Sequence, residues 1–139
     1  MAVGASQQKV ALMRRFGEAV GMAFQIQDDI LDYTRTAHTG KPANNDLREG
    51  KITLPLLAVL DKAPAERRTE LLGRLACCHD DEESVEYLQR TVENEGGLTF
   101  AAEVMRSYIA RAVEMLSEYE ASDYRTALAN LCAYIAERD

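Results

Sequence analysis

The chain has 139 residues, of which 47% are hydrophobic and 28% are charged, a balance typical of a folded domain rather than a disordered chain. The net charge of −7 disfavours nucleic-acid binding, and the longest apolar run, Leu54 to Leu60, is too short to span a bilayer. Three cysteines and the lack of a signal-peptide pattern indicate a reducing compartment, so we expect a cytoplasmic protein.

Helical periodicity runs from Ser6, the predicted N-cap, to about Thr34. One apolar face of this helix comprises Leu12, Phe16, Ala19, Ala23, Ile26 and Ile30. A second, adjacent apolar face comprises Met13, Val20, Phe24 and Leu31. Such a wide apolar arc predicts a helix that is buried on two sides, with Gln27 hydrogen-bonded inside the core. Gly17 and Gly21 in this helix indicate either close helix packing or room for a ligand.

The remaining side of this helix carries a polar stripe formed by Gln25, Asp28, Asp29 and Asp32. At an effective dielectric constant of about 20, two carboxylates about 6 Å apart repel by roughly 3 kcal/mol, whereas water reduces this to well under about 1 kcal/mol. Asp28 and Asp29 have no basic residue three or four positions onward to compensate them. The stripe therefore predicts a cation site, with a solvated acidic face as the alternative.

Periodicity breaks over residues 35–50, where Gly40 and Pro42 are loop signals. Lys41 lies in this loop and Lys51 follows it, so a loop folded over the end of the helix would bring lysines to the carboxylates. Mg²⁺ is held by one or two carboxylates together with substrate phosphates, and lysine supplies further positive charge. The combination indicates a site for a magnesium-bound diphosphate, although a single lysine is more often simply solvated.

The rest of the chain predicts helices at 51–62, 64–77, 81–95, 98–120 and 122–137. Pro55 suits the first turn of its helix, and Ser122 suits an N-cap. We expect an all-α helical bundle with a single domain over residues 1–139. Cys77, Cys78 and His79 lack the spacing of a zinc site, so we assign no metal to them.

The segments FQIQDDILDY (24–33) and GKPANNDLREGKITLPLL (40–57) strongly resemble the second aspartate-rich region of trans-isoprenyl diphosphate synthases, also called polyprenyl synthetases. The elements FQ, DDxxD, GK, DLxxGK and TLP occur in that family's order and spacing. A weaker resemblance continues through Gly96 and Gly97 to LANLCAYIAERD (128–139), which is similar to the family's closing helix. The resemblance covers almost the whole chain and is nearer to the long-chain bacterial type than to the short-chain farnesyl type.

The resemblance implies the C-terminal part of an isoprenoid-synthase fold, in which Mg²⁺ holds an allylic diphosphate between two aspartate-rich helices. It implies that Asp28 is a direct Mg²⁺ ligand. Asp29 and Asp32 would bind the metal directly or through metal-bound water. Asp28 and Asp29, together with Lys41, would form the catalytic set.

The resemblance also implies a set of substrate-binding residues. Gln25 would lie beside the allylic diphosphate, and Phe24 would lie near the incoming isopentenyl unit. Lys41 and Lys51 are expected near the allylic diphosphate, with Asp46 between them in the sequence.

The function that the resemblance implies is Mg²⁺-dependent head-to-tail condensation of isopentenyl diphosphate with an allylic diphosphate by a homodimeric enzyme. The chain has only one of the family's two aspartate-rich motifs, so we expect a C-terminal fragment that is inactive alone. The main alternative is a noncatalytic helical module, either an accessory subunit or a dimerisation unit of a two-chain synthase. A terpene cyclase shares the ionisation chemistry, but the loop with GK and DLxxGK favours chain elongation.

Overall fold

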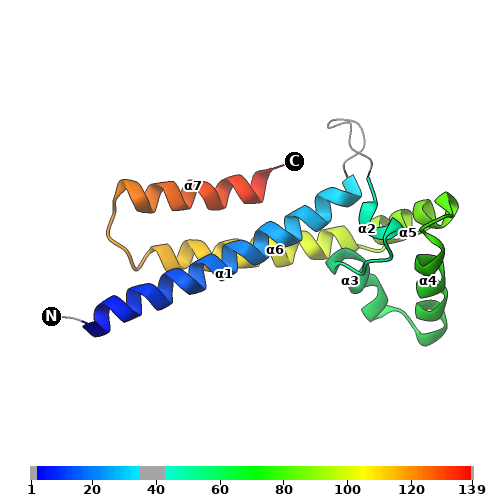
Figure 1. Cartoon of the computed structure of the whole chain (residues 1–139), viewed down its shortest axis with the longest axis horizontal. Coiled ribbons are helices and arrows are strands. Elements are labelled where there is room, and N and C mark those ends of the chain that lie inside the picture. Colours follow the sequence, from blue (N-terminus) through cyan, green and yellow to red (C-terminus); the bar gives the residue numbers. More distant parts are fainter. Residues whose placement is uncertain (1–2, 35–42, 139) are drawn as a thin grey trace. The chain divides into compact units, whose positions relative to one another are not determined.

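The computed structural model describes residues 3–34 and 43–138, with side chains from residue 7 onward (Figure 1). These residues form α-helices and no strand, which confirms the all-α fold. The helices are α1 (Val3–Thr34), α2 (Asn45–Arg48), α3 (Leu54–Lys62), α4 (Ala65–Cys77), α5 (Glu82–Asn94), α6 (Gly97–Leu116) and α7 (Asp123–Glu137). In the described part of the chain, no helix has the length and hydropathy that a bilayer span requires.

The helices belong to two compact units. Unit 1 comprises Met1–Gln27 and Val104–Asp139, and unit 2 comprises Asp28–Glu103. Helices α1 and α6 each contribute residues to both units. This division does not test the prediction of a single domain over residues 1–139, which stays a prediction.

Unit 1 is built from the first part of α1, the second part of α6 and all of α7 (Figure 1). Its core joins the three helices through Phe16, Ala19, Ala112, Leu116 and Cys132. The first predicted apolar face of α1 is buried as expected at Leu12, Phe16, Ala19, Ala23 and Ile26. Ser122 caps α7 by accepting a hydrogen bond from the backbone N–H of Arg125 at 3.1 Å, as predicted.

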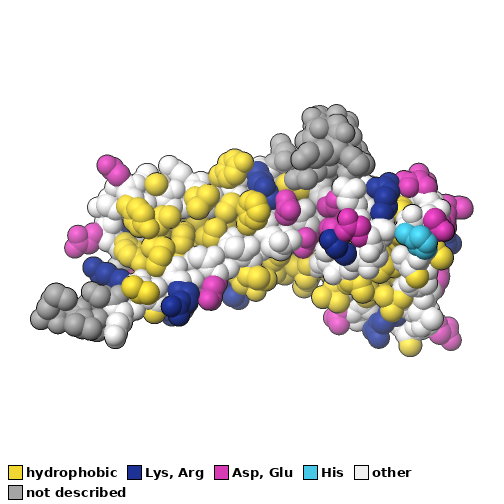
Figure 2. Space-filling model, in the orientation of Figure 1, with side chains coloured by type: hydrophobic (Ala, Val, Ile, Leu, Met, Phe, Trp, Pro, Cys, Tyr) yellow, Lys and Arg dark blue, Asp and Glu magenta, His cyan; other side chains and the backbone are white. Residues whose placement is uncertain are grey.

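Two expectations for α1 need correction. The helix begins at Val3, so Ser6 lies inside it and is not its N-cap. The second apolar face is only partly covered within unit 1, where Phe24 is 44% exposed. Figure 2 shows hydrophobic side chains gathered on one face over α7 and the neighbouring part of α1.

The two glycines inside α1 have free space around them. A Cβ atom added at Gly17 or Gly21 would meet nothing within 4 Å, so close packing among the described residues does not explain these glycines.

Unit 2 packs the end of α1, helices α2 to α5 and the start of α6. Its core of buried residues is Tyr33, Leu47, Leu56, Val59, Leu60, Leu71, Leu75, Cys78, Val85, Leu88 and Val92. At the start of α6, a Cβ atom on Gly97 would lie 2.4 Å from the Pro55 carbonyl oxygen and 2.9 Å from Val92 Cγ1. The helices therefore approach there more closely than a residue with a side chain allows.

The predicted loop over residues 35–50 differs from the structure, because residues 45–48 form the short helix α2. The helix expected from residue 51 begins at Leu54, with Thr53 as N-cap and Pro55 in the first turn, where proline fits best. The helix expected to reach residue 120 ends at Leu116. Lys41 lies outside the described residues.

Candidate functional site

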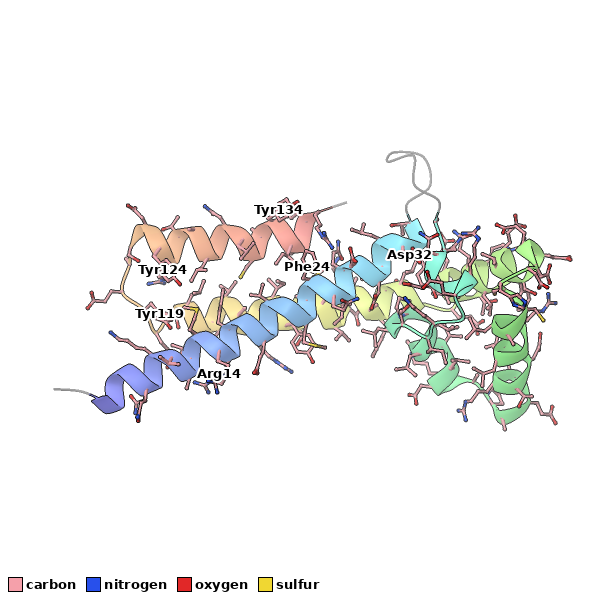
Figure 3. All side chains as sticks on the ribbon, in the orientation of Figure 1. Arg14, Phe24, Asp32, Tyr119, Tyr124 and Tyr134 are labelled. Carbon is pink, nitrogen blue, oxygen red and sulfur yellow. The ribbon has the colours of Figure 1, made fainter. Side chains whose placement is uncertain are left out.

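The three aspartates of the polar stripe lie where α1 ends in unit 2, and Asp32 is labelled in Figure 3. Asp28, Asp29 and Asp32 are half-buried, as expected if the stripe is partly enclosed. Partial burial weakens the screening of carboxylate charges by water, so a bound cation is worth more here than on an open surface. Phe24 and Gln25 are exposed on the preceding turn of the helix, which belongs to unit 1.

Asp32 connects the end of α1 to α2. Its Oδ1 accepts a hydrogen bond from the backbone N–H of Asn45 at 3.2 Å, and its Oδ2 accepts one from that of Asp46 at 2.9 Å. The carbonyl oxygen of Asp32 also accepts a hydrogen bond from the backbone N–H of Asn44 at 2.7 Å. The structure therefore brings Asp46, a predicted site residue, next to the aspartates of α1.

The carboxyl group of Asp46 lies in an acidic environment. Burial raises its pKa, the charges of Asp32 and Asp29 raise it further, and the charge of Lys51 opposes them. The surroundings thus disfavour a negative charge on Asp46, and added positive charge would relieve that penalty.

Lys51 is the predicted lysine that the structure describes. Its Nζ forms an ion pair with Glu49 at 2.7 Å, and both side chains are largely exposed. Glu49 raises the pKa of Lys51 most, and Asp46 and Asp32 add to the effect, so the ammonium group is charged at neutral pH. Its backbone N–H donates to the Asp46 carbonyl oxygen at 2.8 Å, so Lys51 and α2 are joined through the main chain.

Buried polar groups lie directly behind the aspartates. The Tyr33 hydroxyl and Thr53 Oγ1 are near each other, but neither completes a hydrogen bond of normal geometry with any described residue. Burial raises the pKa of Tyr33, and Asp32, Asp46 and Asp29 raise it further, so this hydroxyl stays protonated. Asn44 has a left-handed backbone with φ of 66°, a conformation that asparagine tolerates better than most residues.

Sequence reasoning assigned no role to Arg48, which links α2 to its surroundings. Its Nη1 donates to the Ala43 carbonyl oxygen, and its Nη2 pairs with Glu82 Oε1 of α5 at 2.7 Å. The only signal for it in the sequence is its place inside the DLxxGK pattern, which says nothing about the partner.

Arg138 was also missed. Its guanidinium group lies over the Phe24 ring at 4.2 Å from the centroid, a cation–π contact within unit 1. Gln27 donates from Nε2 to the Arg138 carbonyl oxygen at 2.8 Å, which confirms that Gln27 is a hydrogen-bonded core residue. The two contacts tie the end of the chain after α7 to the turn of α1 that precedes the aspartates.

The carboxylates at the end of α1 fit Mg²⁺ as partial ligands that share the ion with water and substrate phosphate. In the ranges described, no three His, Cys, Asp or Glu side chains are grouped so as to hold a metal by themselves. Mg²⁺ commonly uses only one or two carboxylates and fills its other positions with water and substrate phosphate. The half-buried carboxylates of Asp28 and Asp29 supply hard oxygen ligands of this kind.

Residues 1–94 match the protein-family model described as polyprenyl synthetase. The chain is 34% identical over 137 residues to the short chain isoprenyl diphosphate synthase of Methanothermobacter thermautotrophicus, covering 98% of this chain and 42% of that protein. It is 39% identical over 127 residues to the all-trans-nonaprenyl-diphosphate synthase (geranyl-diphosphate specific) of Rhodobacter capsulatus, covering 91% and 38%. It is also 32% identical to the heptaprenyl diphosphate synthase component 2 of Geobacillus stearothermophilus, covering 100% and 42%.

Solved structures give the same pattern. The geranylgeranyl pyrophosphate synthase of Bacteroides thetaiotaomicron superposes with a TM-score of 0.82 at 30% identity, covering 94% of this chain and 43% of that one. The polyprenyl synthase of Caulobacter crescentus CB15, complexed with calcium and isoprenyl diphosphate, superposes with a TM-score of 0.80 at 32% identity, covering 92% and 39%. The chain thus spans about two fifths of the length of the relatives that it matches.

Proposed function

Because the chain belongs to the polyprenyl synthetase family, we propose that it forms the C-terminal, diphosphate-binding part of a polyprenyl diphosphate synthase. The enzyme would join isopentenyl diphosphate head-to-tail to an allylic diphosphate. The observation that carries this proposal is the meeting of α1 and α2, where Asp32 holds the segment with Asp46 and Lys51. Half-buried carboxylates next to a charged lysine suit a diphosphate that arrives with Mg²⁺.

In the proposed site, Asp28 would bind the metal directly, and Asp29 and Asp32 would act directly or through metal-bound water. When bound, Mg²⁺ would supply positive charge to the oxygens of the leaving diphosphate. Lys51, whose raised pKa keeps it protonated, and Lys41 stabilise the charge that develops on the same oxygens.

On the substrate side, Gln25 lies beside the diphosphate and Phe24 lies near the isopentenyl unit. The allylic C–O bond breaks and its electron pair leaves with the diphosphate. The alkene of isopentenyl diphosphate then attacks the allylic cation, and loss of a proton from the product cation restores a double bond. An apolar, water-poor cavity in the complete enzyme would limit the capture of the cation by water.

Calorimetry tests the metal role. The unaltered chain should bind inorganic diphosphate when Mg²⁺ is present, and Asp28→Ala should weaken that binding by about tenfold or more, the effect of removing a charged interaction. The matched control is Asp80→Ala, because Asp80 is an exposed aspartate of the same unit whose carboxylate lies 3.4 Å from His79 Nε2, away from the aspartates of α1 in sequence. Equal binding by the Asp28 variant, or no Mg²⁺-dependent binding by the unaltered chain, would contradict the proposal.

Several finer features belong to this proposal. We expect the long-chain type, although the relatives are named for products from short-chain to nonaprenyl. We also expect a cytoplasmic homodimer for the complete enzyme.

A second candidate is a helical subunit or dimerisation module of a two-chain synthase. The similarity to a heptaprenyl diphosphate synthase component 2 favours it, since that name belongs to a multicomponent enzyme. The coding sequence immediately upstream separates the two: an in-frame DDxxD motif supports a fragment of one longer enzyme, and its absence supports a separate subunit.

A further inference from the structure

The carboxylate of Asp32 faces backbone donors. Both of its oxygens accept hydrogen bonds from α2, from the N–H groups of Asn45 at 3.2 Å and Asp46 at 2.9 Å. The N–H groups in the first turn of a helix have no partner within the helix, and a nearby carboxylate satisfies them and suits the helix dipole. Asn44, the residue in the N-cap position, makes no side-chain capping bond. Asp32 of another helix therefore provides the cap that α2 does not provide for itself.

Helix α2 depends on such outside support. It has four residues, and a helix this short does not form by itself in water. Besides Asp32, it is held by Leu47, which is fully buried, and by Arg48, which bridges the Ala43 carbonyl oxygen and Glu82. Asp32 is a hydrogen-bonding attachment that comes from α1.

The segment that Asp32 anchors carries other site residues. Asp46 is itself one of the two residues whose N–H groups Asp32 accepts. The Asp46 carbonyl oxygen in turn accepts the N–H of Lys51 at 2.8 Å. The placement of both Asp46 and Lys51 thus follows from the contact that Asp32 makes.

We propose that Asp32 is a positioning residue, which sets Asp46 and Lys51 against the end of α1 by capping α2 instead of holding the metal itself. This inference rests on the proposed function, replaces the metal-binding role given there to Asp32, and leaves the metal to Asp28 and Asp29. It separates the three aspartates of the DDxxD motif into two ligands and one anchor.

Substitution by asparagine distinguishes an anchor from a ligand. Asparagine keeps an amide oxygen that accepts an N–H hydrogen bond, and it is a good capping residue, but it has no negative charge. If Asp32 is an anchor, Asp32→Asn should therefore retain much of its function. If Asp32 is a metal ligand, the same substitution should remove that function. Asp32→Ala should lose the function in either case, and Asp28→Asn provides the matched loss of charge at a proposed ligand.

Two measurements on the full 139-residue chain test the proposal. Hydrogen exchange by NMR reports the backbone N–H groups of Asn45 and Asp46, and calorimetry reports the binding of Mg²⁺ with inorganic diphosphate. Asp32→Ala should speed exchange at these two amides by about tenfold or more and weaken binding by a similar factor. Asp32→Asn keeps one acceptor oxygen in place of two, so exchange should stay within about fivefold at one of the two amides, and binding should stay within about fivefold of the unaltered chain. Asp28→Asn should leave exchange unchanged and weaken binding by about tenfold or more.

Two results would overturn the proposal. One is unchanged exchange at Asn45 and Asp46 in Asp32→Ala. The other is a loss of binding in Asp32→Asn equal to that in Asp28→Asn while exchange stays protected, because Asp32 would then act as a ligand. If the unaltered chain does not bind Mg²⁺ with diphosphate, the proposed function fails, and the exchange measurement still decides whether Asp32 anchors α2.

Discussion

At the scale of single residues, the site contains a lysine, Lys51, whose present ion pair can be replaced by an interaction with a ligand. Lys51 is paired with Glu49 at 2.7 Å, and both side chains are more than half exposed, so the pair can open at low cost. A diphosphate that approaches Lys51 must compete with the Glu49 carboxylate. Glu49 therefore acts against anion binding, even though it lies within the motif that resembles a substrate loop.

Removing that competitor gives a prediction. Glu49→Gln should tighten the binding of inorganic diphosphate with Mg²⁺ by about two- to fivefold, measured by calorimetry, because exposed ion pairs are worth little more than this. Glu49 is the main cause of the raised pKa of Lys51, but a lysine without that partner is also protonated at neutral pH, so the gain should be constant from about pH 6 to pH 8. Glu66→Gln, a change of the same charge at an exposed position in α4, is the control. Unchanged or weaker binding by the Glu49 variant would contradict the role given to Lys51.

At the scale of elements, unit 2 depends on a close contact between α3, α5 and the start of α6. Gly97 has no room for a side chain, because a Cβ atom there would lie 2.4 Å from the Pro55 carbonyl oxygen. Backbone atoms cannot move aside as a flexible side chain can. The contact thus explains why glycine occupies a helical position, where it is usually unfavourable.

The corresponding variant pair is Gly97→Ala and Gly73→Ala. The first should lower the free energy of unfolding by about 1–3 kcal/mol, since alanine forces the helices apart. The second should raise it by roughly 0.5–1 kcal/mol, because Gly73 lies inside α4 and a Cβ there meets nothing within 4 Å. Urea unfolding followed by circular dichroism measures both. A similar change in the two variants would show that the close contact does not limit stability.

The elements also show how far the sequence could predict the structure. Periodicity located the long helices, and the first apolar face of α1 is buried as predicted, because 3.6-residue spacing is a local property. Helix α2 could not be predicted, since its cap comes from Asp32, thirteen residues earlier. The contact between Arg138 and Phe24 was equally hidden, because it joins residues from opposite ends of the chain. The predicted break at Gly96 and Gly97 was correct in place, but only packing explains why glycine is needed at Gly97.

At the scale of the whole molecule, the chain carries one aspartate-rich motif and spans about two fifths of its relatives' length. Unit 1 also exposes several large apolar side chains. These are Val10, Met22, Phe24, Val113, Tyr124, Leu131 and Tyr134. Exposed apolar surface on this scale promotes association with other protein surfaces.

The isolated chain should therefore be unable to carry out prenyl transfer. Incubated with an allylic diphosphate, isopentenyl diphosphate and Mg²⁺, it should yield no elongated product by mass spectrometry, because one aspartate-rich helix cannot enclose the leaving group. The complete short chain isoprenyl diphosphate synthase of Methanothermobacter thermautotrophicus serves as the positive control. Repeated turnover by the purified 139-residue chain would refute this expectation.

The attachment of Arg138 to α1 has a practical consequence for these experiments. Its carbonyl oxygen accepts from Gln27, and its guanidinium group covers Phe24, four positions before Asp28. A purification tag joined after Asp139 would add residues directly beside that attachment. A change in ligand affinity could then come from the tag, so binding should be measured on protein with no residues added after Asp139.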